Sequence, residues 1–116
     1  MITAYGIPNC NTVKKAVTWL KDQDLPYTFH DFKKQGVTAA QLNGWCAVFG
    51  WEKVLNKKGT TWRKLSADEQ VAVKDQASAV AVMLANPSSI KRPVIERDGK
   101  ALLIGFQEEE YAGILR

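Results

Sequence analysis

The feature that most constrains the fold is a strand, a turn and a helix joined by residues 5–13 (YGIPNCNTV). Residues 1–5 are predicted to form a short strand, and apolar residues recur at helical spacing over residues 11–22. The glycine, proline and asparagine between these segments are typical of a tight connection. We therefore expect Cys10 at or next to the N-terminus of the helix.

A thiol in this position faces the positive end of the helix dipole and unpaired backbone N–H groups, and both favour the reactive thiolate. The alternative is that Cys10 is a small buried apolar residue. Its polar neighbours Asn9, Asn11 and Thr12 argue against that. An ordinary thiol, with a pKa of about 8.5, is only ~3% ionised at pH 7. Because the dipole alone adds little, strong activation of Cys10 requires a nearby cation.

A second predicted strand is followed by a largely helical middle segment. Residues 27–32 are rich in aromatic residues and predict a second strand, so the N-terminal part forms a βαβ unit with parallel strands. Helical patterns follow over about residues 38–86, where Thr38 and the capping pattern at Ser66 mark helix starts. Within this segment, residues 57–63 are predicted to be a basic loop or turn and residues 78–85 the last helix.

The C-terminal part predicts a hairpin and a helix. Asp98-Gly99 between the segments at 93–97 and 101–104 is the strongest hairpin signal in the sequence. Glu108 begins an acidic first turn of a final helix. The element order indicates an α/β protein with a thioredoxin-like fold, in which βαβ and ββα parts form a mixed four-stranded sheet. The helical segment is an all-helical subdomain inserted into a single domain of residues 1–116.

Size and composition agree with such a domain and exclude several classes. A chain of 116 residues that is 46% hydrophobic and 24% charged can bury a core without metal or disulfide support. No apolar run is long enough to cross a bilayer, and no signal peptide is recognisable, so we expect a cytoplasmic protein. The net charge of +4 comes from scattered lysines and arginines, which argues against nucleic acid as a partner.

Cysteine and histidine usage argues against a disulfide or a metal site. The two cysteines, Cys10 and Cys46, lie in different elements, and Val13 occupies the position where a CxxC motif would have its second thiol. Cys46 falls on an apolar helical stripe and is predicted to pack in a core. The one histidine, His30, lies in the aromatic strand and is interpreted as structural.

Three segments, in the same order along the chain, resemble the arsenate reductase (ArsC) family, and within it the YffB subgroup, with Spx-type regulators as more distant relatives. They are Pro-Asn-Cys-Asn-Thr at 8–12, Asn-Lys-Lys-Gly-Thr-Thr-Trp-Arg-Lys-Leu at 56–65 and Lys-Arg-Pro-Val at 91–94. The resemblance implies a thioredoxin-like fold with a helical insertion. It also implies a nucleophilic cysteine at Cys10, an oxyanion-binding arginine at Arg92 and a cis proline at Pro93.

The chain departs from arsenate reductases of this type at two of their three arginines. Lys57 and Lys58 stand in the basic loop, with Lys58 the nearer match, and Gly-Phe-Gln at 105–107 stands where the third arginine is expected. Because a tetrahedral oxyanion is held best by bidentate guanidinium groups, these departures argue against arsenate as the substrate.

The resemblance therefore favours a glutathione-dependent monothiol reductase that forms a covalent adduct at Cys10. Catalysis would rest on Cys10 and Arg92, and substrate or glutathione would bind at Asn11, Thr12, Lys58, Arg63 and Pro93. Glutathione would be the reducing co-substrate, and the substrate would be a small oxidised or disulfide compound. A glutaredoxin-type protein is a further expected partner. The chain would be a monomer without a metal. The alternatives are an arsenate reductase and an Spx-like regulator that binds RNA polymerase. Spx-like proteins use a CxxC redox switch, which Val13 removes here.

Overall fold

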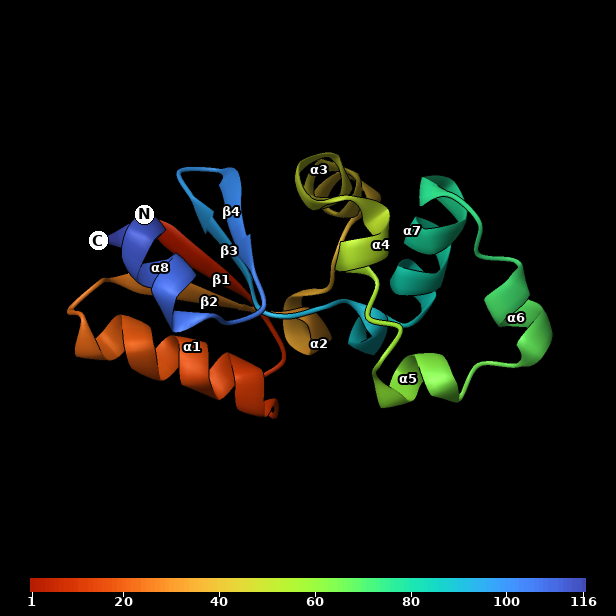
Figure 1. Cartoon of the computed structure of the whole chain (residues 1–116), viewed down its shortest axis with the longest axis horizontal. Coiled ribbons are helices and arrows are strands. Elements are labelled where there is room, and N and C mark those ends of the chain that lie inside the picture. The colour runs from red at the N-terminus through yellow and green to blue at the C-terminus, as the bar shows by residue number, and fades with distance from the viewer. The chain divides into compact units, whose positions relative to one another are not determined.

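The computed structural model describes all 116 residues, Met1–Arg116. The chain divides into two compact units (Figure 1). The first unit is Met1–Gln35 together with Arg92–Arg116, and the second is Gly36–Lys91. The helical insertion expected over residues 38–86 falls inside the second unit.

The first unit is a mixed four-stranded sheet with helices, in the predicted βαβ and ββα order. Its elements are β1 (Ile2–Gly6), α1 (Asn11–Asp22), β2 (Tyr27–Asp31), α2 (Phe32–Gln35), β3 (Val94–Arg97), β4 (Lys100–Ile104) and α8 (Glu108–Leu115). The strand order is β2-β1-β3-β4. The β1 and β2 strands are parallel, whereas β3 is antiparallel to both β1 and β4.

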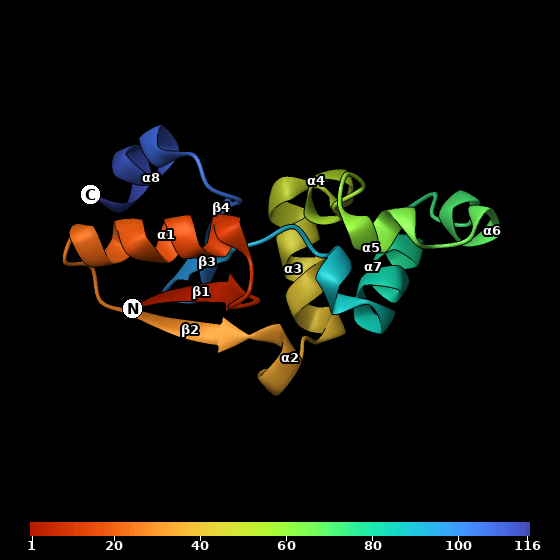
Figure 2. The ribbon, with the colours of Figure 1, turned by 90° about the horizontal axis from the view of Figure 1, so that it is seen from below.

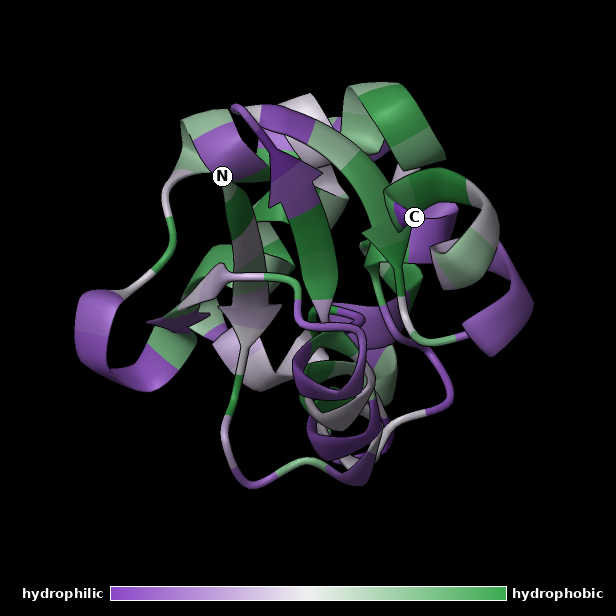
Figure 3. Cartoon of the chain, turned by 90° about the vertical axis from the view of Figure 1, so that its left-hand side faces the viewer, coloured by the Kyte–Doolittle hydropathy of each residue, from purple (hydrophilic) through white to green (hydrophobic).

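Helices α1 and α8 cover the same face of this sheet, as Figure 2 shows. The core between them consists of buried residues from β1, α1, β3, β4 and α8: Ile2, Ala4, Ala16, Trp19, Leu20, Ile95, Leu103, Tyr111 and Leu115. Figure 3, which faces this unit, shows largely hydrophobic strands at its centre. The alternation of buried and half-buried residues along β1 follows from the period of two in a strand.

Local sequence explains the hairpin and corrects the length of the second strand. Asp98 and Gly99 both have positive φ, 53° and 81°, as a two-residue turn between twisted strands requires. The prediction that the second strand extends to Phe32 is wrong. The carboxylate of Asp31 accepts a hydrogen bond from the N–H of Lys33 at 2.9 Å, which turns the chain into α2 and buries Phe32.

A buried hydrogen-bonded connection links α8 to the start of β3. The hydroxyl of Tyr111 donates to the carbonyl of Gly105 at 2.5 Å, and the N–H of Gly105 donates to the carbonyl of Pro93 at 2.8 Å. Burial, with the charge of Glu110, raises the pKa of Tyr111, so its phenol stays protonated and able to donate. The ring also packs edge-on against Trp19 and Phe106.

We expect Tyr111→Phe to lower the free energy of unfolding by about 1–3 kcal/mol, because the Gly105 carbonyl loses a buried donor. Urea denaturation followed by circular dichroism measures this change. Tyr27→Phe, which removes the hydroxyl of a half-buried tyrosine in β2, serves as the control. Equal stability of the Tyr111→Phe and Tyr27→Phe variants would contradict the importance of this hydrogen bond.

The second unit is helical. It contains α3 (Ala39–Phe49), α4 (Trp51–Val54), α5 (Thr60–Arg63), α6 (Ala67–Val71), α7 (Gln76–Ala85) and a 3-10 helix, Pro87–Ser89. The predicted helix starts at Thr38 and Ser66 are confirmed, because both residues form capping boxes. Residues 57–63 were predicted as a loop, but their last four residues form α5. The last helix begins earlier than the predicted residue 78, because Asp75 caps it.

The core of the second unit includes Leu42, Trp45 and Cys46 of α3 together with Val80 and Met83 of α7. None of the helices of the chain is long and apolar enough to cross a membrane.

Candidate active site

Cys10 lies at the junction that the sequence predicts, as the N-cap residue of α1. Its backbone is extended, with φ −126° and ψ 126°, and its carbonyl accepts the first hydrogen bond of the helix, from the N–H of Lys14 at 2.9 Å. The thiol is half-exposed, so a substrate can reach the sulfur. Asn11 and Thr12 are the first two residues of the helix.

The surroundings of Cys10 favour the thiolate over the thiol. Burial opposes ionisation, but the backbone N–H groups of Val13 and Thr12 and the guanidinium of Arg92 outweigh it and hold the pKa of Cys10 below the ordinary value. The thiol forms no side-chain capping hydrogen bond, whereas a thiolate in its place is stabilised by the N–H groups of Val13 and Thr12. Arg92 acts both through its charge and through a hydrogen bond to the sulfur.

Sheet geometry explains how Arg92, distant in sequence, reaches Cys10. The β3 strand runs antiparallel to β1, and Val94 pairs with Tyr5. The residues just before β3 therefore lie beside the residues just after β1, which is where the loop to Cys10 begins. The Arg92-Pro93 peptide bond is cis, as the resemblance implied.

Gly6, the last residue of β1, permits this close arrangement. A Cβ atom at this position would lie 2.9 Å from Cγ2 of Val13 and 3.6 Å from Cβ of Arg92. The first distance is shorter than real Cβ contacts, and Val13 is buried, so an added Cβ overpacks the site. A side chain at position 6 would therefore displace the first turn of α1 relative to the end of β1.

We expect Gly6→Ala to cost about 1–3 kcal/mol of stability through overpacking and to slow alkylation of Cys10 at neutral pH, because Val13 carries one of the N–H groups that favour the thiolate. Thermal unfolding and iodoacetamide kinetics measure the two effects. Gly113→Ala, at an exposed position in α8 where a Cβ meets nothing within 4 Å, is the matched control. A Gly6→Ala variant that matches this control in both assays would show that neither stability nor the reactivity of Cys10 depends on the close approach of Val13 to position 6.

The second cysteine has the opposite properties. Cys46 is only 4% exposed in the core of the second unit, and burial raises the pKa of its thiol. The chain therefore contains one accessible thiol with a lowered pKa and one buried thiol that resists ionisation. This agrees with the interpretation of Cys46 as a core residue.

The predicted anion-binding residues Lys58 and Arg63 belong to the second unit, and their role stays a prediction. Lys58 is exposed, and its backbone N–H donates to Oδ1 of Asn56 at 3.2 Å. Arg63 ends α5 and is also exposed. The ammonium of the neighbouring Lys57 lies 5.2 Å from the ring centre of Trp51 and 5.6 Å from that of Trp62, both cation–π distances.

The position expected for a third arginine is occupied by an apolar contact. Phe106 packs its ring 4.8 Å from that of Tyr111, and Gln107 precedes α8 as its N-cap residue. Sequence reasoning missed two residues that shape the site, Gly6 and Tyr111. A glycine at the end of a predicted strand next to the cysteine loop was the available signal for the first.

His30 lies on the other face of the sheet among aromatic rings. It stacks on Tyr5 with 4.8 Å between ring centres and approaches Phe32 at 6.1 Å. Tyr5 in turn donates a hydrogen bond to Glu96 at 3.0 Å, and burial with that carboxylate raises the pKa of Tyr5 to about 12. These contacts agree with a structural histidine.

The fold and this site together define a thioredoxin-like α/β protein with an ionisable cysteine at a helix N-terminus. The model of the ArsC family matches residues 5–114, and the chain belongs to that family. It is similar to a solved structure titled YFFB protein, with 46% identity, complete coverage of both chains and a TM-score of 0.94.

Two other matches extend the comparison. The solution structure of an arsenate reductase (ArsC) related protein from Brucella melitensis is 49% identical, covers 99% of this chain and 94% of that one, and has a TM-score of 0.76. The global transcriptional regulator Spx of Staphylococcus aureus is 27% identical over 95% of this chain and 83% of its own. The protein is therefore arsenate-reductase-like, within a family that also has Spx-related members.

Proposed function

We propose that this chain is a glutathione-dependent monothiol reductase that acts through the thiolate of Cys10. The observation that carries the proposal is the half-exposed thiol at the N-terminus of α1, whose pKa is lowered by Val13, Thr12 and Arg92 against the effect of burial. A lowered pKa makes the thiolate available at neutral pH, and the thiolate is the attacking species in disulfide exchange.

The proposed chemistry is two thiol–disulfide exchanges. The Cys10 thiolate attacks one sulfur of a substrate disulfide, the sulfur–sulfur bond breaks, and the second sulfur leaves as a thiolate that takes up a proton. Glutathione thiolate then attacks the substrate sulfur in the Cys10 adduct. Cys10 returns to the thiolate, and the substrate leaves as a mixed disulfide with glutathione. Arg92 and the helix N-terminus stabilise the negative charge on sulfur at both stages.

An external thiol is part of the proposal because the chain offers no second accessible thiol. Val13 occupies the CxxC position, and Cys46 is buried in the other unit. Glutathione is the proposed thiol because the family resemblance expects a cis proline beside the cysteine, suited to holding a short extended peptide, and the Arg92-Pro93 bond is cis. Asn11, Thr12, Lys58 and Arg63 remain the proposed contacts to anionic groups.

A second candidate is an Spx-like regulatory role, favoured by the match to the Staphylococcus aureus regulator over most of both chains. The absence of a second thiol at Val13 argues against a redox switch of the CxxC type in this chain. Arsenate reduction is a weaker candidate, because Phe106 packs against Tyr111 at the position where a third anion-binding arginine was expected.

Glutathionylation of the intact protein tests the proposal. After incubation with glutathione disulfide, we expect one glutathionyl group on Cys10 and none on Cys46, located by peptide mapping. Reduced glutathione should then remove the adduct and restore the free thiol. An adduct that reduced glutathione leaves in place, but that another small thiol such as dithiothreitol removes, would overturn the choice of glutathione as the reductant.

A further inference from the structure

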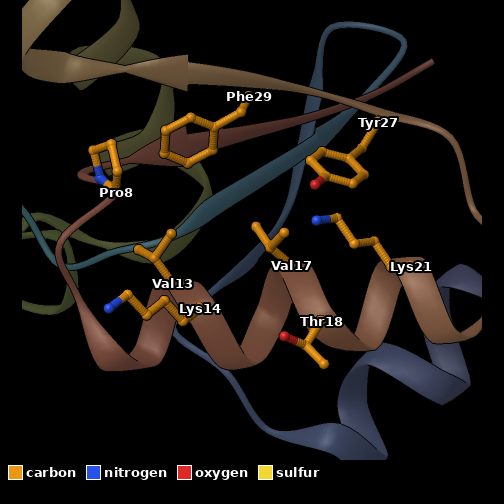
Figure 4. Close-up of a pocket in the computed structure, with 8 residues that line it drawn as sticks. All are labelled: Pro8, Val13, Lys14, Val17, Thr18, Lys21, Tyr27 and Phe29. Carbon is orange, nitrogen blue, oxygen red and sulfur yellow. The ribbon is translucent and has the colours of Figure 1, made fainter.

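A pocket of about 390 Å³ lies between α1 and β2, wholly within the first unit. Eight residues line it: Pro8, Val13, Lys14, Val17, Thr18, Lys21, Tyr27 and Phe29. We call it the α1–β2 groove (Figure 4). No residue of the second unit lines it.

The floor of the α1–β2 groove is apolar and partly open. Figure 4 shows Val13 and Val17 pointing from α1 toward Phe29 and Tyr27 of β2. Val17 and both aromatic residues are half-buried, and the two rings also pack at the edge of the core. Because these side chains keep apolar surface in water, covering them with an apolar side chain of a ligand is favourable.

The rim of the groove is positively charged. Lys14 and Lys21 are both exposed, and no acidic residue lines the groove. They are seven residues apart in one helix, a distance of about 10 Å along its axis. An extended peptide covers that distance with about three residues. Carboxylate side chains at this spacing could meet both ammonium groups while an apolar side chain between them covers the floor.

The groove begins beside the nucleophile. Pro8, at one end, is two residues before Cys10, and Val13, in the floor, supplies one of the N–H groups that lower the pKa of the Cys10 thiol. A chain bound along α1 from this end would therefore have one terminus next to the sulfur of Cys10 and the other near Lys21 and Tyr27.

We propose that the α1–β2 groove binds an acidic and apolar segment of a polypeptide substrate, next to the cysteine whose sulfur Cys10 attacks. The inference rests on the proposed function and adds its substrate class, a protein or peptide disulfide. In the attack, the bond between the peptide sulfur and its partner sulfur breaks, the Cys10–peptide disulfide forms, and the partner leaves as a thiolate. Charge complementarity and continuity with the Cys10 loop identify the occupant.

Short peptides with one cysteine, linked through a disulfide to 2-thiopyridine, test this. Release of thiopyridone measures the rate at which Cys10 attacks. One peptide carries, on one side of the cysteine, two glutamates three residues apart with a phenylalanine between them. A second has lysine in place of both glutamates, and a third has serine in place of phenylalanine. The full chain is used in a Cys46→Ala background, and iodoacetamide, small and neutral, measures thiolate reactivity separately.

For the unsubstituted groove, we expect the glutamate–phenylalanine peptide to react about fivefold faster than either of the others, with a difference that shrinks as salt is added. Lys21→Glu should remove the preference for the acidic peptide and leave the iodoacetamide rate unchanged. Lys100→Glu, the same charge reversal at an exposed position on β4, should leave both unchanged.

Equal rates for the three peptides, or equal effects of Lys21→Glu and Lys100→Glu, would overturn the groove assignment. In both cases fast reaction with iodoacetamide would leave the proposed function standing. A preference for the acidic peptide that survives Lys21→Glu would likewise place peptide recognition elsewhere. If Cys10 reacts with iodoacetamide no faster than an ordinary thiol, it is the proposed function that fails.

Discussion

Cys10→Ser is expected to abolish reduction of disulfide substrates while the protein stays folded. A serine hydroxyl does not ionise near neutral pH and cannot form the disulfide adduct on which turnover depends. We expect the rate to fall to that of glutathione alone, as measured by release of the first substrate thiol and formation of the mixed disulfide between substrate and glutathione. The side chain is half-exposed and makes no capping hydrogen bond in the fold, so the melting temperature should change little.

Cys46→Ala is the matched control, because it removes the other thiol. Cys46 is 4% exposed and its pKa is raised by burial, so we expect this variant to keep full turnover and to lose some stability through the small cavity it leaves. Turnover that persists in the Cys10→Ser variant and disappears in the Cys46→Ala variant would show that Cys46, and not Cys10, is the reactive thiol.

Arg92→Ala is the second large expected effect. Because the positive charge of Arg92 and its hydrogen bond favour the thiolate, their loss raises the pKa of Cys10. An ordinary thiol is ~3% ionised at pH 7, so the thiolate fraction, and with it the rate of alkylation, can fall by up to about 30-fold at that pH. The difference between the two proteins should shrink as the pH rises, since both thiols are ionised above about pH 10.

Two further variants separate charge from geometry. Arg92→Lys keeps a positive charge but loses the planar fork, so we expect a pKa between those of the wild type and Arg92→Ala. Arg116→Ala removes an arginine whose Nε donates to Gln23 at 2.9 Å, at the far end of α1, and should leave the pH profile of Cys10 unchanged. Identical profiles for Arg92→Ala and Arg116→Ala would mean that Arg92 does not act on the thiolate.

Local signals were sufficient for much of the fold. The helical spacing over residues 11–22 and the Asp98-Gly99 turn predicted α1 and the hairpin, and both are confirmed. The capping patterns at Thr38 and Ser66 succeeded for the same reason, because a cap is specified by residues within one turn.

The elements that were predicted wrongly have sequence patterns that are short or that fit two kinds of structure. The α5 helix has only four residues, too few for an apolar period, and was predicted as part of a loop. Phe32 fits a strand by composition, but the side chain of Asp31 stops β2 before it. Asp75 was overlooked as a cap because Ser78, its reciprocal partner, is itself a typical helix-starting residue.

The site was predictable in part. The position of Cys10 at the start of α1 follows from the strand–turn–helix pattern alone. Arg92, by contrast, was placed by the resemblance, because periodicity and spacing cannot bring together residues from opposite ends of a chain. The roles of Gly6 and of the Tyr111–Gly105–Pro93 connection depend on contacts across the sheet, which no single segment of sequence contains.

The most direct test of the central claim is the pKa of Cys10, measured from the pH dependence of iodoacetamide alkylation in a Cys46→Ala background. The account predicts a pKa below that of an unstructured cysteine peptide measured alongside, and a rise toward the peptide value in the Arg92→Ala variant. A pKa equal to that of the peptide, and insensitive to Arg92, would contradict it, because Cys10 would then be an ordinary thiol with no anion-stabilising surroundings.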